Sequence, residues 1–75
     1  MNKERRAKVA KLLEEISMAR AALEELKDEE QEYLDNMPES LQGGEKGEKA
    51  QEAIDALESA ISNMESAESD LEGVE

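Results

Sequence analysis

The side chains best suited to chemistry are cations, amides and one phenol, and most of them lie within or next to a single Pro/Gly-rich stretch. That stretch, residues 36–48, contains the only proline and three of the four glycines. A pair of arginines lies apart from it, near the N-terminus. Guanidinium and ammonium groups bind phosphate and carboxylate oxygens, and phenol or amide groups can complete such a site. The candidate residues for binding a ligand or partner are therefore Arg5, Arg6, Tyr33, Asn36, Gln42, Lys46 and Lys49.

Catalysis has few candidate groups in this chain. There is no histidine and no cysteine, so a nucleophilic triad has no imidazole base and a dinuclear bundle site has no Glu-x-x-His pair. The glycines and lysines of residues 43–49 lack the Gly-Lys-Ser/Thr spacing of a phosphate-binding loop. The carboxylates of residues 28–32 are interpreted as a solvated helix face and not as metal ligands. We predict that the protein is not an enzyme and uses no cofactor or metal.

Charge is distributed unevenly along the chain. The net charge is −12, yet residues 1–11 carry five basic residues against one acid, whereas residues 50–75 carry eight acids and no base. A chain folded back on itself would lay the basic head against the acidic tail, which favours antiparallel pairing. Each exposed ion pair contributes about 0–1 kcal/mol, so charge selects the orientation more than it supplies stability. The negative charge also argues against direct binding of nucleic acid.

The first half of the chain predicts a helix over about residues 3–35. One row of residues at heptad spacing consists of Val9, Ile16, Leu23, Glu30 and Met37. A second row, three positions further on, consists of Leu12, Ala19, Leu26 and Tyr33. These are the a and d positions of a heptad. Because Leu13 and Leu34 widen the apolar stripe, this helix has more apolar surface than one partner helix would cover.

The second half predicts a helix over about residues 47–72, built on a seven-residue internal repeat. Its rows consist of Ala50, Leu57, Met64 and Leu71, of Ala53, Ala60, Ala67 and Val74, and of Ile54 and Ile61. The connection, residues 36–46, begins where Pro38 disfavours helical angles at Met37. It can hold a single turn at 38–41 before Gly43 and Gly44. We therefore expect one all-α domain over residues 1–75, an antiparallel two-helix hairpin with coiled-coil-like packing.

A hairpin of this size buries little surface, so we expect it to need a partner. The chain has 75 residues and offers neither a disulfide nor a histidine-containing zinc site. Chains this short are only marginally stable without a disulfide or a structural metal. Self-association is the remaining route, which predicts a homo-oligomeric helical bundle, dimeric or larger. No apolar run approaches the roughly 18 residues of a membrane span, and the charged start does not look like a signal peptide. We expect a cytoplasmic protein without membrane contact.

The connection and its flanks also carry a resemblance. Residues 33–42 read Tyr-Leu-Asp-Asn-Met-Pro-Glu-Ser-Leu-Gln, an acidic segment precedes them, and an Ala/Ile/Leu-rich helix follows. This arrangement resembles a group of small acidic helical-hairpin proteins of Firmicutes and their phages, which share a Tyr-x-x-Asn-Met-Pro-Glu-x-Leu-Gln turn. The resemblance covers roughly residues 24–65, although relatives often carry serine where this chain has Gly44. It implies a phage or mobile-element setting, with the host cytoplasm as location, and brings no catalytic residues.

Two binding functions follow as hypotheses. In the first, an oligomer captures a small anionic ligand, for example a nucleotide signal of a bacterial defence system, between the connection and a neighbour's basic head. In the second, the acidic faces form the functional surface, either by docking on a basic host protein or by imitating a nucleic-acid backbone. The first hypothesis rests on the candidate cations and Tyr33, and the second rests on the net charge of −12.

Overall fold

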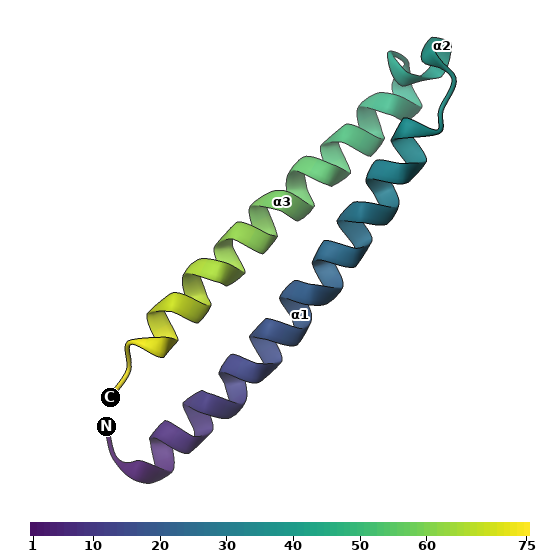
Figure 1. The fold of residues 1–75 in the computed structure, drawn as a ribbon. Helices are drawn as coiled ribbons and strands as arrows, with labels where there is room; N and C mark the ends of the chain where they lie inside the picture. The colour runs from purple at the N-terminus through teal and green to yellow at the C-terminus, as the bar shows by residue number, and fades with distance from the viewer.

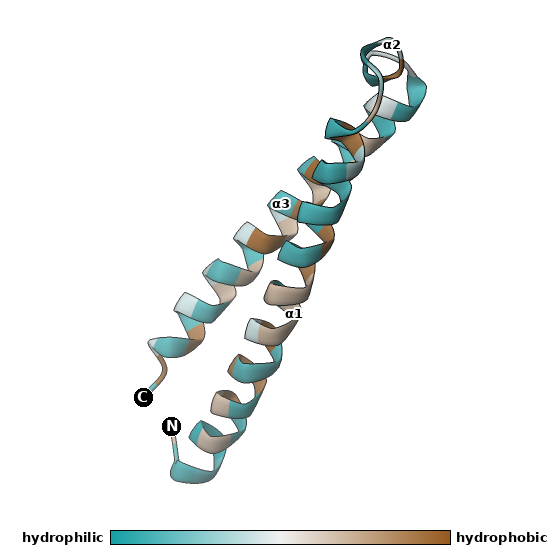
Figure 2. Ribbon diagram, turned by 45° about the vertical axis from the view of Figure 1, so that its right-hand side comes forward, coloured by the Kyte–Doolittle hydropathy of each residue, from teal (hydrophilic) through white to brown (hydrophobic).

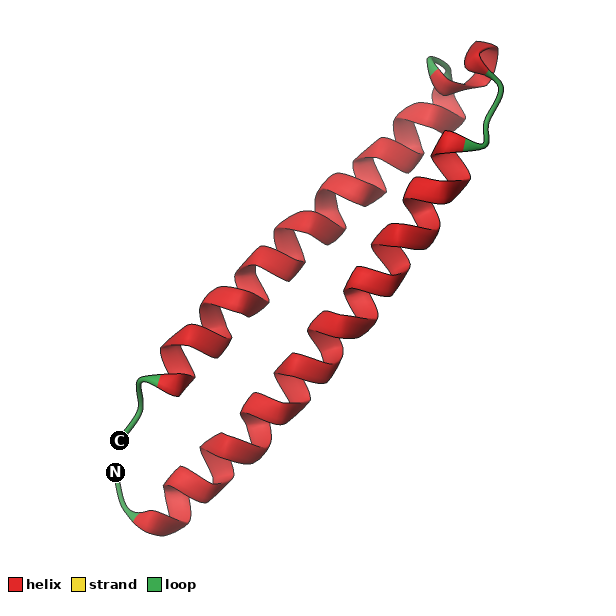
Figure 3. Ribbon diagram, in the orientation of Figure 1, coloured by secondary structure: helices red, strands yellow, loops and turns green.

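The computed structural model describes all 75 residues, and every regular element in it is a helix (Figure 3). Helix α1 spans Lys3–Asp35, the short α2 spans Glu39–Gln42, and α3 spans Glu45–Glu72. The two long helices run antiparallel, so both chain ends lie at one end of a rod and α2 lies at the other (Figure 1). The rod measures 58 × 14 × 12 Å. The all-α hairpin predicted from the sequence is confirmed.

Local hydrogen bonds explain where α1 begins and ends. The side chain of Asn2 accepts a hydrogen bond from the backbone N–H of Arg5 at 2.8 Å, which caps the first turn. At the other end the backbone N–H of Met37 donates to the carbonyl of Leu34 at 3.1 Å. The next residue, Pro38, has no N–H and an extended ψ of 145°. The helix therefore ends before the proline, as the sequence indicates.

Helix α3 begins at Glu45, two residues before the predicted start. Gly47 consequently lies inside the first turn of α3, where it is buried. A Cβ atom at this position would lie 1.8 Å from the carbonyl oxygen of Gln42, the last residue of α2. Glycine is required here because the backbones of α2 and α3 approach each other too closely for any side chain.

The core between the two long helices is thin. Apolar segments recur along both helices (Figure 2), but only five residues in the whole chain are buried. Ile54 is the most enclosed, with 1% of its surface exposed, and no residue of α1 is buried. The buried set consists of Met37, Gly47, Ala50, Ile54 and Ile61. No helix of the protein has an apolar stretch long enough to cross a membrane.

The face that α1 turns toward α3 corrects one sequence-based prediction. The predicted row at Val9, Ile16, Leu23, Glu30 and Met37 is half-buried or buried throughout. The second inward row, however, is half-buried at every position and consists of Leu13, Arg20, Lys27 and Leu34. The predicted second row is exposed at every position: Leu12, Ala19, Leu26 and Tyr33. The physical reason is that Arg20 and Lys27 both reach carboxylates on α3.

Ion pairing between the helices also differs from the prediction. The two chain ends do meet, because the amino group of Met1 donates to the backbone carbonyl of Glu75 at 2.8 Å. The basic side chains of residues 3–11 nevertheless form no ion pair with the acidic tail. The pairs that cross the hairpin lie in its middle, from Arg20 to Glu68 and from Lys27 to Glu58. In the antiparallel hairpin, the ion pairs between helices thus lie in the middle of the rod, and the basic head forms none with the acidic tail.

Candidate functional site

A surface depression of about 370 Å³ lies at the turn of the hairpin. Residues from all three helices and the connection form it, because the chain reverses direction there within a few residues. The end of α1 supplies Tyr33, α2 supplies Leu41, and the first turn of α3 supplies Lys46. The lining is completed by Asn36, Met37 and Pro38. The volume reaches the lower end of the range of small-molecule sites, but the depression is open to solvent and not an enclosed cavity.

The polar groups of this depression have no partner within the chain. The phenol of Tyr33, the side-chain amide of Asn36 and the ammonium of Lys46 take part in no side-chain hydrogen bond or ion pair. No side chain caps the N-terminus of α3, which begins beside Lys46. A helix N-terminus carries partial positive charge and free N–H groups. The depression therefore combines hydrogen-bond donors and positive charge with apolar contacts, as a ligand with a flat ring and an anionic group would require.

Gln42, another predicted site residue, holds the turn together. Its side-chain Nε2 donates to the carbonyl of Met37 at 3.0 Å and to the carbonyl of Leu34 at 3.2 Å. The Leu34 carbonyl belongs to the last turn of α1, and the Met37 carbonyl lies two residues beyond it, where no helical donor follows. Gln42 does not line the depression that contains Tyr33. Its contacts are those of a capping residue.

The remaining predicted cations lie away from the depression. Lys49 pairs with Glu45 one turn earlier on α3, at 3.1 Å between Nζ and Oε1, and both side chains are largely exposed. Arg5 and Arg6 lie in the first turns of α1, at the opposite end of the rod from α2 (Figure 1). The Nη1 atom of Arg6 donates to the carbonyl of Met1 at 2.9 Å. A single chain therefore brings together Tyr33, Asn36 and Lys46 but neither arginine.

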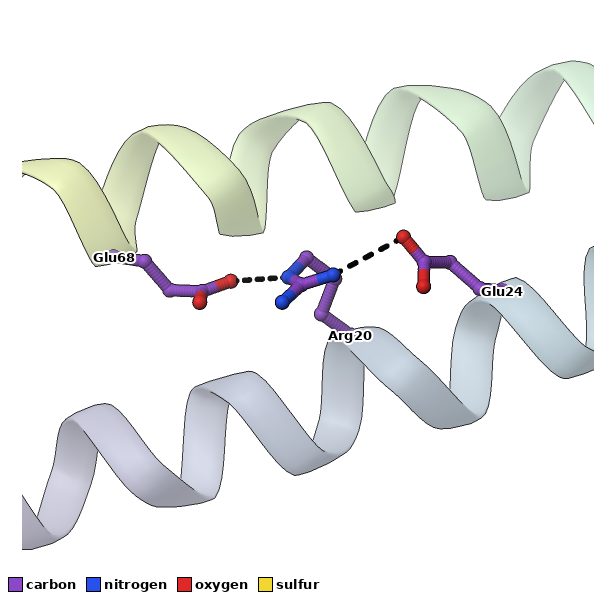
Figure 4. Close-up of polar contacts among 3 residues, drawn as sticks. All are labelled: Arg20, Glu24 and Glu68. Carbon is purple, nitrogen blue, oxygen red and sulfur yellow. Dashed lines mark hydrogen bonds and ion pairs between the residues drawn. The ribbon is translucent and has the colours of Figure 1, made fainter.

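A second polar cluster, between α1 and α3, was not anticipated from the sequence. Arg20 lies between two carboxylates, with Nε 2.5 Å from Oε1 of Glu68 and Nη1 3.1 Å from Oε1 of Glu24 (Figure 4). The hydrogen bond to Glu68 and the charge of that carboxylate raise the pKa of Arg20. The cluster borders a polar depression of about 350 Å³ whose other lining residues are Glu65, Ser69 and Glu72. The signal that could have revealed it is the heptad spacing of Arg20 from Leu13 and Leu34.

Fold and site together define a small helical-hairpin protein with an open, donor-lined depression at its turn. The structure contains no group of three or more acidic side chains arranged to hold a metal ion. Comparison with protein-family models, with curated proteins and with solved structures found no match to this chain.

Proposed function

We propose that this protein is a non-enzymatic binding protein that sequesters a small anionic ligand in the depression at its turn. The observation that carries the proposal is the convergence of Tyr33, Asn36 and Lys46 around apolar side chains, with none of the three polar groups engaged in a side-chain hydrogen bond or ion pair. A phenol ring can stack on a flat ring, while ammonium and amide groups can bind phosphate oxygens. Nucleotides combine these two features, so a nucleotide is the ligand class that the lining suits best.

The setting of this activity is proposed from the turn sequence. Residues 33–42 resemble the turn of small proteins from Firmicutes and their phages, which supports an anti-defence role in the cytoplasm of a host cell. A protein that removes a nucleotide immune signal by stoichiometric capture needs affinity and abundance but no catalytic group. The absence of histidine and cysteine from the chain is compatible with capture of this kind.

The proposal is tested by thermal-shift measurements against cyclic mononucleotides, cyclic dinucleotides and nucleotide sugars. A ligand at about 100 times its Kd stabilises the folded state by about 2.7 kcal/mol, which corresponds to a rise in melting temperature of several degrees for a domain of this size. Tyr33→Ala and Lys46→Ala should reduce the rise. Lys49→Ala is the matched control, because Lys49 lies outside the depression. Absence of any shift across the panel would contradict ligand capture.

A second candidate function rests on the acidic surface of α3. Of the eight carboxylate side chains in residues 50–75, only Glu58 and Glu68 form ion pairs, both with α1. The other six leave uncompensated negative charge along α3, which suits docking on a basic protein or imitation of a nucleic-acid backbone. Pull-down from host lysate should then retain a basic protein at low salt and release it when DNA is added. Equal retention by a variant with Glu65→Gln and Glu72→Gln would count against this function.

A further inference from the structure

We infer that α1 carries a self-complementary interface on which a second copy of this chain packs antiparallel and contributes its arginines to the ligand depression. This inference rests on the proposed function for the identity of the site, and on separate observations for the interface. Within one chain, the depression has Lys46 as its only cation, while the net charge of −12 repels anions at longer range. Additional positive charge is therefore needed for tight binding.

The interface begins with the apolar row of α1 that the hairpin leaves uncovered. Leu12 is 53% exposed, and Leu26 and Tyr33 are each 51% exposed. Together with Ala19 they recur every seventh residue, which keeps them on one side of the helix over about 30 Å. A row with this spacing is the pattern by which one helix packs along another.

The same row pairs with itself when two copies run in opposite directions. If a two-fold axis passes between residues 22 and 23, Leu12 faces Tyr33 of the second copy, and Ala19 faces Leu26 of the second copy. Each contact then occurs twice, as two-fold symmetry requires. The alanine leaves room for the larger leucine opposite it, so the row can pack closely along its length.

Charge complementarity selects a second copy, in this orientation, as the occupant. Arg5, Arg6, Lys8 and Lys11 form no ion pair within the chain, and neither do the acids of residues 28–35 at the other end of α1. Antiparallel packing of two α1 helices brings each basic end beside the partner's acidic end. Parallel packing would place like charges together, which is unfavourable.

The exposed area is large enough for such an interface. The chain exposes 5646 Å², whereas a compact monomer of 8.3 kDa would expose about 4,600 Å². The elongated hairpin thus exposes roughly 1,000 Å² more than a compact monomer, and a standard interface buries about 800 Å² per partner. A second copy can cover this excess.

The symmetry that aligns the apolar rows also completes the ligand site. In the antiparallel register, residues 5 and 6 of the second copy lie about 6–8 Å beyond Asp35, the last residue of α1. This is the end of the rod at which Tyr33, Asn36 and Lys46 form the depression. Two guanidinium groups then join Lys46 at each depression, and a dimer carries two equivalent sites. Guanidinium groups suit this task because they bind phosphate oxygens through paired N–H donors.

Disulfide trapping tests the register directly, since the chain has no native cysteine. A mixture of the Ala19→Cys and Leu26→Cys chains should form a mixed disulfide under mild oxidation, whereas each chain alone should cross-link poorly. Residues 19 in the two copies would be about 10 Å apart along the helix axis, beyond the roughly 7 Å limit between bridged Cα atoms. Cross-linking of each chain alone without the mixed product would overturn the antiparallel register. Absence of cross-linking in all three samples would overturn the interface.

Inorganic pyrophosphate, compared with sodium chloride of equal ionic strength, tests the contribution of the arginines. We expect pyrophosphate to raise the melting temperature of the wild type, and the double variant Arg5→Ala/Arg6→Ala to lose most of this rise. Lys3→Ala/Lys49→Ala removes the same charge at residues outside the depression and outside the basic set that faces the partner's acids, and should retain it. An equal rise in both double variants, or no rise in the wild type, would overturn the role of the arginines. If the expected pyrophosphate and cross-linking results are obtained but no nucleotide raises the melting temperature, only the proposed function is contradicted.

Discussion

Arg20 and Glu68, 48 residues apart in the sequence, are joined across the hairpin by a hydrogen-bonded ion pair with 2.5 Å between Nε and Oε1. Their side chains are 25% and 15% exposed, so the pair lies within the seam between α1 and α3. Lys27 makes a second contact of this kind with Glu58, at 3.7 Å. These pairs hold the side of α1 that carries Arg20 and Lys27 against α3. The apolar row at Leu12 and Leu26 is thereby left on the surface.

Replacing Arg20 should weaken the hairpin. Arg20→Gln leaves the carboxylate of Glu68 in the seam without its cation, so the urea midpoint of unfolding, followed by circular dichroism, should fall. Lys49→Gln removes a charge from an exposed pair within one helix and should change the midpoint much less. Equal midpoints for Arg20→Gln and the wild type would show that the pair does not hold the seam.

The same pair should contribute no pH dependence near neutrality. The hydrogen bond and charge of Glu68 raise the pKa of Arg20, so from neutral pH up to the ordinary arginine pKa the stabilisation stays fully present. It is lost only when the pH rises through the raised value, beyond the range of ordinary measurements. The difference in urea midpoint between the wild type and Arg20→Gln should therefore be the same at pH 7 and pH 10. A difference that shrinks at pH 10 would contradict this assignment.

Gly47→Ala should destabilise the fold through the contact between α2 and α3. The added Cβ would lie 1.8 Å from the Gln42 carbonyl oxygen, and forcing backbone to shift in this way costs about 1–3 kcal/mol. Gly43→Ala is the control, because a Cβ there meets nothing within 4 Å and φ is −85°. That variant should be neutral or more stable by up to about 1 kcal/mol. Equal urea midpoints for the two variants would show that α2 and α3 do not approach closely at residue 47.

Gln42→Ala should separate the structure of the turn from ligand binding. It removes both side-chain hydrogen bonds to the end of α1, and each net hydrogen bond is worth about 1 kcal/mol. The free energy of unfolding should fall by about 1–2 kcal/mol for the two bonds, while ligand affinity measured below the melting transition should stay the same. Gln51→Ala, which removes a surface hydrogen bond within α3, should cost less. A loss of affinity without a loss of stability would instead make Gln42 a binding residue.

Self-association should strengthen with added salt at low ionic strength. Two chains of charge −12 repel each other, and the screening length falls from about 30 Å at 0.01 M to about 8 Å at 0.15 M ionic strength. Salt weakens the long-range repulsion between whole chains more strongly than it weakens ion pairs between atoms a few ångströms apart. The dimer fraction from sedimentation velocity should therefore rise between these two conditions. A fall over this range would mean that ion pairs, and not the apolar row, hold the copies together.

The hairpin itself could be predicted because its signals are local. Pro38 and the glycines at 43 and 44 interrupt two long heptad patterns, and the structure reverses direction at these residues. The face of α1 that packs within the chain could not be predicted from apolar spacing. The row at Leu12 and Leu26 is more apolar than the row at Arg20 and Lys27, yet the charged row packs inward because its partners lie on α3.

The candidate site shows the same division between local and distant signals. Tyr33, Asn36 and Lys46 flank the turn in sequence and come together in space. Gln42 lies among them in sequence, but its orientation toward the end of α1 depends on how α2 folds back. The requirement for glycine at position 47 likewise follows from that fold and has no signature in the sequence.

The most direct test of the whole account is native mass spectrometry of the purified chain in the presence of the nucleotide panel. We predict a species of twice the 8.3 kDa chain mass that binds up to two molecules of at least one panel member, with Leu12→Gln/Leu26→Gln reduced to the single-chain mass. The control Met18→Gln, at a residue that is 73% exposed but outside the apolar row, should remain dimeric. A wild-type spectrum that contains only the single chain, without bound nucleotide, would contradict the account.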